Sequence, residues 1–348
     1  MRRIETNEID DKKKASLRNR LVVSGILIAI AVPALVFGSW FWFALISLFL
    51  VMAIYEVIKA PNKKYSPLIY IFTYVIILSF VYWFLVKYNV QRFRDLKLVG
   101  NEDAWVFSLE NWYSALYISV YGIALAFGFY CLFAIIHKDF SWNDVIYLFT
   151  MSIVIGVGFQ SFLFLRYFPF AAQAELAEMA GTTFAPDNQF KWWGSNVLVI
   201  FVIACCYLND SWAYFVGMLF GKHHMNERVS PNKTWEGFFG GWILGGISAF
   251  AFAMICDACG FPLLESMRIF GEKSAWWWPL ILSFSLPLIG DIGDFTFSLI
   301  KRHYGIKDYG KSLGAMGGVL DRADSLLFCS IYASVFVVFI DAGWNFFA

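Results

Sequence analysis

The chain has 348 residues, of which 59% are hydrophobic and only 15% are charged, and its mean hydropathy is +0.61. This composition excludes an ordinary soluble domain and is typical of a membrane protein. The net charge of +1 is distributed along the chain without one concentrated basic surface, so no nucleic-acid partner is expected.

Backbone amides in hydrocarbon must find hydrogen-bond partners within their own segment, so long apolar runs predict transmembrane helices. We therefore predict an all-α fold, a polytopic membrane helix bundle of about nine transmembrane helices. Residues 1–20 are predicted to be a cytoplasmic tail, 21–200 an N-terminal region of about five spans, and 201–348 a C-terminal region that carries the polar motifs. The predicted spans lie near residues 21–38, 40–58, 67–86, 114–136, 144–166, 196–220, 238–257, 276–300 and 323–344.

The basic residues predict the orientation of the bundle. If the N-terminus is cytoplasmic, 19 of the 27 Lys and Arg residues fall on the cytoplasmic side. Such a bias is the usual mark of the inner face. We therefore expect a multi-pass protein of the cell membrane, with its N-terminus and its active site on the cytoplasmic side.

Acidic residues within or beside the apolar runs are costly and suggest function. Asp210 lies in the sixth run, although it could instead be a hydrogen-bonded group at a helix contact. Asp291 and Asp294 are three residues apart, on one face of the eighth run, and Asp321 and Asp324 repeat this spacing at the start of the ninth. Carboxylates at a helix start are also ordinary caps. Gathered carboxylates nevertheless favour a hard divalent cation such as Mg²⁺.

Two loops on the same predicted face supply complementary charge. They are GKHHMNERVSPNKTWEG (221–237) and KRHYGIKDYGKSLGAMGGVLDR (301–322). Both combine basic side chains with glycines, which let backbone amides approach an anion. The alternative is a general attraction to anionic lipid heads. The density of glycine beside carboxylates favours phosphate binding.

The second loop and its flanks follow the pattern S-x-[apolar]-K-R, four residues, K-D, then G-G, an apolar pair, D-R and D. The pattern is carried by Ser298, Lys301, Arg302, Lys307, Asp308, Gly317, Gly318, Asp321, Arg322 and Asp324, with an upstream G-D at Gly293 and Asp294. Two further elements, D-x-x-A-Y-F-x-G and S-P-x-K-T-x-E-G, begin at Asp210 and Ser230. Over about residues 205–328 the chain thus resembles the phosphatidate cytidylyltransferase (CDP-diacylglycerol synthase) family. Met316 stands where that family has a histidine.

The resemblance implies an enzyme that transfers a cytidylyl group from CTP to phosphatidic acid in the bilayer, giving CDP-diacylglycerol and pyrophosphate. It implies catalytic roles for Asp294, Asp321, Lys301, Arg302, Lys307 and Arg322. It implies substrate contacts for Asp210, Tyr214, Ser230, Lys233, Thr234, Glu236, Ser298, Asp308, Gly317 and Gly318. Mg²⁺ ligands are expected from Asp294 and Asp321, with Asp324 and Asp291 as further candidates. A second cation such as K⁺ and a homodimer are left open.

Two other functions are compatible with these residues. An ion-coupled transporter would line its pathway with Asp210, Asp291 and Asp294. A CTP-dependent lipid kinase, or a cytidylyltransferase for another lipid phosphate, would use the same charges. A transporter should place its acidic residues near the middle of the membrane, whereas these residues cluster with the basic loops.

Overall fold

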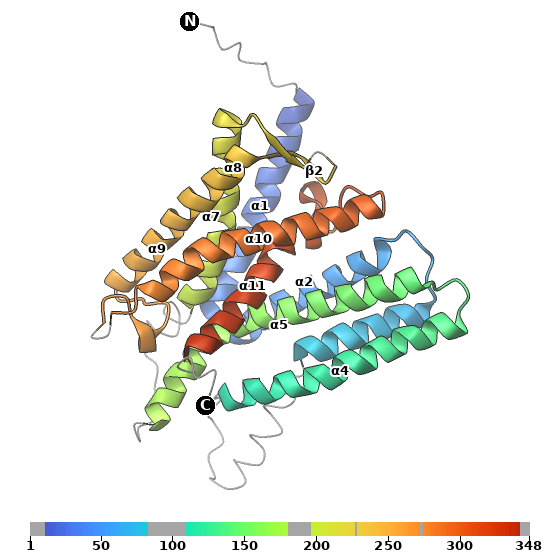
Figure 1. Ribbon diagram of the computed structural model, residues 1–348, viewed down its shortest axis with the longest axis horizontal. Coiled ribbons are helices and arrows are strands. Elements are labelled where there is room, and N and C mark those ends of the chain that lie inside the picture. The colour runs from blue at the N-terminus through green and yellow to red at the C-terminus, as the bar shows by residue number, and fades with distance from the viewer. Residues whose placement is uncertain (1–10, 83–108, 180–195, 227, 272–273, 342–348) are drawn as a thin grey trace, which may run out of the picture.

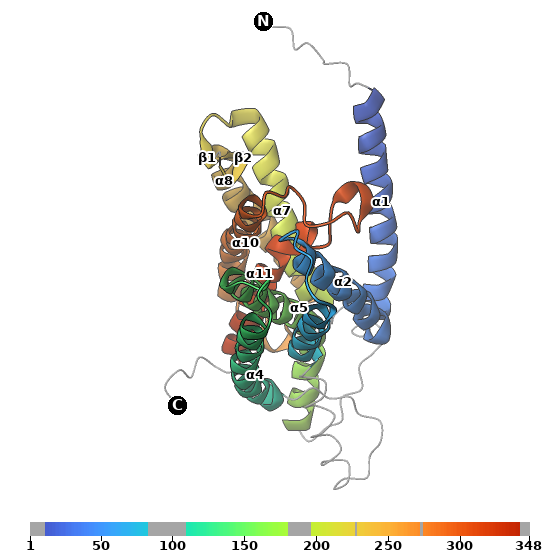
Figure 2. The ribbon, with the colours of Figure 1, turned by 90° about the vertical axis from the view of Figure 1, so that its right-hand side faces the viewer.

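The computed structural model describes residues 11–82, 109–179, 196–226, 228–271 and 274–341. These residues form a helical bundle with one short hairpin (Figures 1 and 2). The helices are α1 (Asp11–Phe37), α2 (Ser39–Lys59), an unlabelled helix (Pro67–Tyr82), α4 (Leu109–Ile136), α5 (Trp142–Met179), α7 (Val197–Phe220), α8 (Trp235–Gly240), α9 (Gly246–Ala258), α10 (Trp277–His303) and α11 (Leu320–Asp341).

The predicted membrane bundle is confirmed. Within the described residues, six helical segments are long and apolar enough to cross a membrane, and three shorter apolar helices coincide with the remaining predicted spans. One of the six is continuous from Trp235 to Ala258, because a π-helical turn (Gly241–Gly245) joins α8 to α9. The chain is therefore an integral membrane protein.

The helix boundaries differ most from the prediction at two places. Helix α1 begins at Asp11, within the predicted tail, and α5 continues to Met179, beyond the predicted end at residue 166. The extension of α5 ends in the sequence AAQAELAEM, whose residues are strong helix formers. The predicted tail residues 1–10 and most of the two long connections, at 83–108 and 180–195, lie outside the described residues.

The first basic loop contains a hairpin that the sequence pattern did not predict. Strands β1 (His224–Asn226) and β2 (Ser230–Thr234) pair antiparallel, with His224 opposite Thr234 and Asn226 opposite Ser230. The Asn226 side chain accepts the backbone N–H groups of Arg228 and Val229, each at 3.2 Å, and so closes the turn. The hairpin carries Lys233 from the end of α7 toward α10.

Glycines allow the C-terminal helices to approach closely. A Cβ at Gly293 of α10 would lie 2.8 Å from the backbone oxygen of Asp324 in α11. Likewise, a Cβ at Gly241 or Gly245 would lie within 3 Å of Asn209 in α7. Small residues at such crossings are the usual means of tight packing in membranes, where helix association depends on van der Waals contact.

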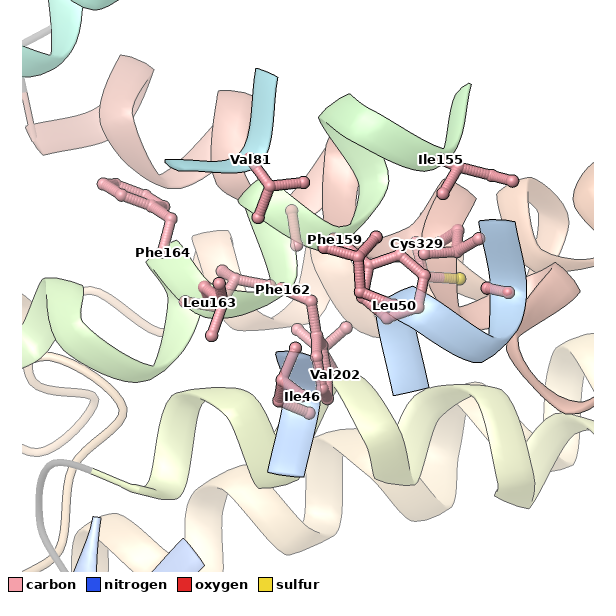
Figure 3. Packing of buried hydrophobic residues seen from close by; sticks show 14 of the residues in the cluster. Ile46, Leu50, Val81, Ile155, Phe159, Phe162, Leu163, Phe164, Val202 and Cys329 are labelled. Carbon is pink, nitrogen blue, oxygen red and sulfur yellow. The ribbon is translucent and has the colours of Figure 1, made fainter. Parts of the chain in front are cut away.

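Helix α11 contacts α5, α7 and α10. Its Cys329 lies in a buried cluster with residues of α2, α5 and α7, among them Leu50, Phe159 and Val202 (Figure 3). A Cβ at Gly158 of α5 would lie 2.8 Å from Leu327 of α11, so these helices are also in close contact. This packing fixes the N-terminal end of α11, where the polar site lies.

Candidate active site

One face of α10 carries the acidic residues of the site. Asp291, Asp294, Ser298 and Lys301 follow one another at helical spacing, so they share a face. Asp291 and Lys301 are buried, and Asp294 is partly exposed. The Ser298 hydroxyl donates to Asp294 Oδ1 over 3.4 Å. The predicted common face of Asp291 and Asp294 is present.

Lys233 of β2 binds both carboxylates. Its Nζ lies 2.7 Å from Asp291 Oδ1 and 2.8 Å from Asp294 Oδ2, and 4.6 Å from the centre of the Phe295 ring. Burial opposes the charge of this lysine, but the two carboxylates outweigh burial and raise the pKa of Lys233. The Asn209 amide donates to the other Asp291 oxygen at 3.3 Å. Lys233 is therefore a charged ammonium group held against α10 by two carboxylates.

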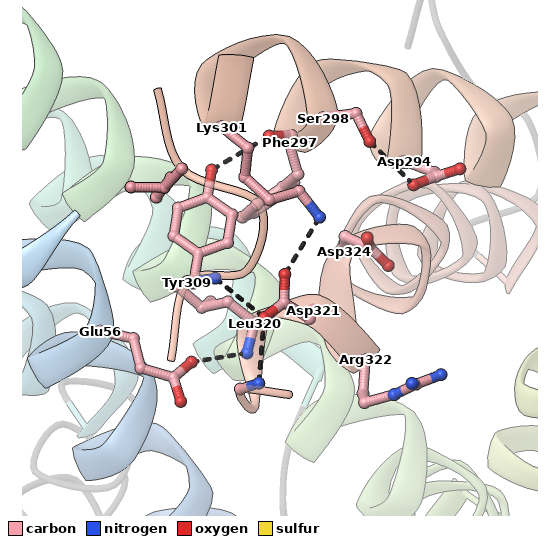
Figure 4. Close-up of polar contacts among 12 residues, drawn as sticks. Glu56, Asp294, Phe297, Ser298, Lys301, Tyr309, Leu320, Asp321, Arg322 and Asp324 are labelled. Carbon is pink, nitrogen blue, oxygen red and sulfur yellow. Dashed lines mark hydrogen bonds and ion pairs between the residues drawn. The ribbon is translucent and has the colours of Figure 1, made fainter. Parts of the chain in front are cut away.

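Asp321 at the start of α11 is enclosed by three donors (Figure 4). Oδ1 accepts a charged hydrogen bond of 3.0 Å from Lys301, and Oδ2 accepts the backbone N–H groups of Tyr309 at 2.9 Å and Gly318 at 3.0 Å. Burial, with Asp321 nearby, raises the pKa of Tyr309, so its hydroxyl stays protonated and donates to the Phe297 carbonyl. Asp321 thus joins α10, α11 and the intervening loop.

Asp324 and Asp210 have fewer partners. Asp324 is buried beside α10, and its carboxylate accepts the N–H of its neighbour Ser325 at 2.9 Å. Among the residues that the structure describes, none forms an ion pair with Asp324 or Asp210. Figure 4 shows the Asp324 carboxylate beside that of Asp294. Within the described residues, Asp210, Asp294 and Asp324 together have one ion-pair partner, Lys233.

A cavity of about 460 Å³ opens beside this cluster. It lies between α7, the hairpin, α8 and α10, and combines charged groups with aromatic and thioether side chains. Its lining includes Asp210, Tyr214, Met225, Lys233, Thr234, Phe238 and Asp291. A ligand in this cavity would contact Lys233 and the acidic groups together.

Other predicted substrate residues support the walls of the cavity. Thr234 caps α8 by accepting the N–H of Gly237 at 3.2 Å. Glu236 binds the His223 ring at 2.5 Å and the backbone N–H groups of Lys222 and His223 at 3.2 Å. Ser230 lies in the strand pair opposite Asn226.

Within the described residues, neither Arg302 nor Arg322 forms an ion pair with the carboxylates around Lys233. Arg302 donates to the Val229 carbonyl at 3.3 Å and lines a second cavity, of about 540 Å³, with Arg228 and His303. Arg322 donates twice to the carbonyl of Met316, both bonds at 3.0 Å. The backbone of Met316, which stands where the family that the sequence resembles has a histidine, thus anchors Arg322.

The loop after α10 places its predicted phosphate-binding groups differently. Lys307 and Asp308 are exposed. Gly317 adopts a φ of 91°, a left-handed conformation that favours glycine. The Gly318 amide donates to Asp321. The anion at this glycine amide is therefore a carboxylate of the protein.

Sequence reasoning missed Glu56 and Asn209. Glu56 of α2 accepts the N–H groups of Val319 at 3.0 Å and Leu320 at 2.9 Å. Both residues are polar groups inside predicted spans. The rule that singled out Asp210 applies to the acidic Glu56 but not to the uncharged Asn209. Neither residue belongs to the motifs of the two basic loops, so no sequence pattern linked them to the site.

The sequence matches the cytidylyltransferase family over residues 18–340. A phosphatidate cytidylyltransferase of Haemophilus influenzae is 28% identical over 329 residues, which cover 93% of this chain and 99% of the relative. That of Bacillus subtilis is 27% identical over 255 residues, 69% of this chain and 80% of the relative. That of Staphylococcus saprophyticus is 40% identical over 131 residues, so the match spans only 45% of that relative and 37% of this chain. Since the family match includes every residue of the site, the chain belongs to the cytidylyltransferase family.

Proposed function

We propose that this protein is a phosphatidate cytidylyltransferase, which forms CDP-diacylglycerol and pyrophosphate from CTP and phosphatidate. The observation that carries the proposal is the position of Lys233, whose ammonium binds Asp291 and Asp294 at the edge of the 460 Å³ cavity. Fixed positive charge beside clustered carboxylates suits a reaction between two phosphate-bearing substrates. The names of the relatives support the same reaction.

The reaction needs positioning and charge neutralisation more than a protein nucleophile. A phosphate oxygen of phosphatidate attacks the α-phosphorus of CTP, and the bond from that phosphorus to the β-phosphate oxygen breaks. Pyrophosphate leaves with the electron pair. Both substrates are anions, so an ammonium held beside the cavity lowers the repulsion between them. Lys233 is proposed for this role, and Lys301, held by Asp321, is proposed as the second cation.

The donor set fits a hard divalent cation. Asp294 of α10 and Asp324 of α11 lie beside one another, Asp210 lines the adjoining cavity, and Lys233 forms an ion pair with Asp294 alone among the three. Within the described residues, no three acidic, histidine or cysteine side chains converge as a complete metal site. This arrangement suits Mg²⁺, which binds one or two carboxylates and completes its coordination with substrate phosphates and water. When bound, Mg²⁺ supplies charge neutralisation for those phosphates.

Two of the expected metal ligands have other partners. The oxygens of Asp321 accept bonds from Lys301, Tyr309 and Gly318, and those of Asp291 accept bonds from Lys233 and Asn209. Asp294 also binds Lys233, but its side chain is 28% exposed, against 9% for Asp291 and 7% for Asp321. Mg²⁺ is therefore proposed to bind Asp294 and Asp324, with Asp210 as a third candidate. Asp321 and Asp291 are proposed to position the two lysines.

The site is proposed to face the cytoplasm, where CTP is dissolved. The excess of Lys and Arg in the hairpin and in the loop after α10 supports that orientation. The cell membrane is the proposed location. Arg228 and Arg302, which line the second cavity, suit attraction of anionic lipid heads at this face.

The test uses the full chain purified in detergent with Mg²⁺ and CTP labelled at either the α- or the γ-phosphate. With phosphatidate, label from α-labelled CTP should enter the lipid, and label from γ-labelled CTP should not. With diacylglycerol in place of phosphatidate, a CTP-dependent lipid kinase would instead transfer the γ label to the lipid. A failure to label phosphatidate from α-labelled CTP would refute the proposal.

Matched carboxylate variants give the control. Asp294→Asn should reduce labelling at least about 100-fold, because one charged ligand beside the phosphates is lost. Asp257→Asn removes a different buried carboxylate, which binds Arg268 at 3.3 Å and the Phe270 N–H at 2.7 Å at the opposite end of α9 from the hairpin. That variant should keep the activity of the unmodified protein.

A further inference from the structure

Glu56 is a buried acid on a helix that carries none of the family motifs. It lies near the end of α2, is only 3% exposed, and falls within the predicted second span. Its carboxylate accepts the backbone N–H groups of Val319 and Leu320 and the hydroxyl of Ser312. Figure 4 shows it directed at the beginning of α11.

The charge of Glu56 is offset by these donors. Among the residues that the structure describes, no Lys, Arg or His forms an ion pair with it. Two of its donors are orphan amides at the start of α11, where the helix dipole also favours a negative charge. A helix is usually capped by a residue next to it in the sequence. Here the cap comes from a residue more than 260 positions away.

Three consecutive backbone amides bind two different carboxylates, one in the site and one on α2. The Gly318 N–H binds Asp321, and the next two N–H groups, from Val319 and Leu320, bind Glu56. Asp321 in turn holds the ammonium of Lys301. Glu56 therefore binds the segment that orients Lys301, without touching the lysine itself.

Two glycines of the loop are packed directly on Glu56. A Cβ at Gly310 or at Gly318 would lie 2.6 Å from a carboxylate oxygen of Glu56. A side chain at either position would have to displace that carboxylate or the loop. The absence of a Cβ at both positions lets the loop close over the acid.

We propose that Glu56 is a positioning residue for the cytidylyl transfer. Its carboxylate holds the start of α11 and the loop before it, so that Asp321 and Lys301 are aligned for the reaction. This inference rests on the proposed function. It extends the active site to the N-terminal half of the chain, outside the segment that carries the motifs.

The first test compares Glu56→Gln with Asp257→Asn in the α-labelled CTP assay. Glutamine keeps the shape but loses the charge and one acceptor. We expect kcat to fall at least about five-fold. KM for CTP should change less than about three-fold, because Glu56 does not line the cavity that contains Lys233. Asp257→Asn should leave kcat unchanged. A smaller fall for Glu56→Gln, or an equal fall for Asp257→Asn, would overturn the inference.

A second test does not depend on activity. Amide hydrogen exchange across residues 304–321 should be faster in Glu56→Gln than in the unmodified protein, and unchanged in Asp257→Asn. If the unmodified protein labels no lipid, the proposed function fails, and exchange still decides whether Glu56 holds this segment. Unchanged exchange would overturn the inference even for an active enzyme.

A third test uses the close contact with Gly318. Gly318→Ala should reduce kcat at least about five-fold in the unmodified background, but less than about two-fold further in Glu56→Ala, because the clashing carboxylate is gone. Additive losses in the double variant would show that the two residues act independently. The single variant Gly318→Ala tests the same contact if Glu56→Gln fails to fold, because it crowds the carboxylate without removing its charge.

Discussion

The ammonium of Lys301 lies 3.0 Å from Oδ1 of Asp321, with the lysine side chain 11% exposed and the aspartate side chain 7% exposed. This pair joins the end of α10 to the start of α11. A buried ion pair is costly to form, so it contributes mainly by defining one arrangement of the two helices. Tyr309 and Gly318 satisfy the second carboxylate oxygen and complete that arrangement.

Replacing one residue of the Lys301–Asp321 pair should destabilise the protein, because the other charge is then left buried without its partner. Lys301→Met leaves Asp321 buried without its cation and should cost about 3 kcal/mol, and Asp321→Asn should cost a similar amount. The double variant should cost less than the sum of the two. Denaturant unfolding in detergent micelles measures all three. If the cost of the double variant equals the sum of the two single costs, the pair does not couple the helices.

Lys233 should stay charged throughout the pH range of the assay. Its pKa is raised above the ordinary value, so the stability that it contributes is fully present below about pH 10.5 and is lost only as the pH rises through the higher folded value. The stability difference between the unmodified protein and Lys233→Met should therefore be constant from about pH 6 to pH 10. A difference that shrinks within that range would contradict the double contact with Asp291 and Asp294.

The close crossing of α10 and α11 should not tolerate a methyl group at its centre. Gly293→Ala should cost about 1–3 kcal/mol, because its Cβ would lie 2.8 Å from the Asp324 backbone oxygen, and activity should fall with it. Gly128→Ala in α4 is the matched control, since among the described residues a Cβ there would meet no side chain and no backbone of another element within 4 Å. Thermal unfolding of the two variants, with labelling activity, provides the comparison.

Asp324 should control the need for a divalent cation. With one carboxylate fewer, Asp324→Asn should raise the Mg²⁺ concentration for half-maximal activity at least about ten-fold. A Mg²⁺ titration of the labelling reaction measures this value, and Asp257→Asn should keep the unmodified requirement. If Asp321→Asn shifts the requirement and Asp324→Asn does not, the assignment of ligands between these two residues is reversed.

The sequence by itself determined the number and approximate bounds of the apolar helices, because hydrocarbon requires long uninterrupted helical segments. It also determined that Asp291 and Asp294 share a face, since three-residue spacing on a helix leaves no alternative. The segment that carries the polar site could also be recognised, because ionisable groups inside membrane spans are rare.

Only the tertiary structure decided which of these charges meet. Helical spacing defines a face but not the neighbour of that face, so the binding of Lys233 to α10 depended on a hairpin that no periodic pattern announced. The donors of Asp321 come from a folded loop. Glu56 reaches the site because the end of α2 lies against the start of α11, and a contact across more than 260 residues leaves no local signal in the sequence.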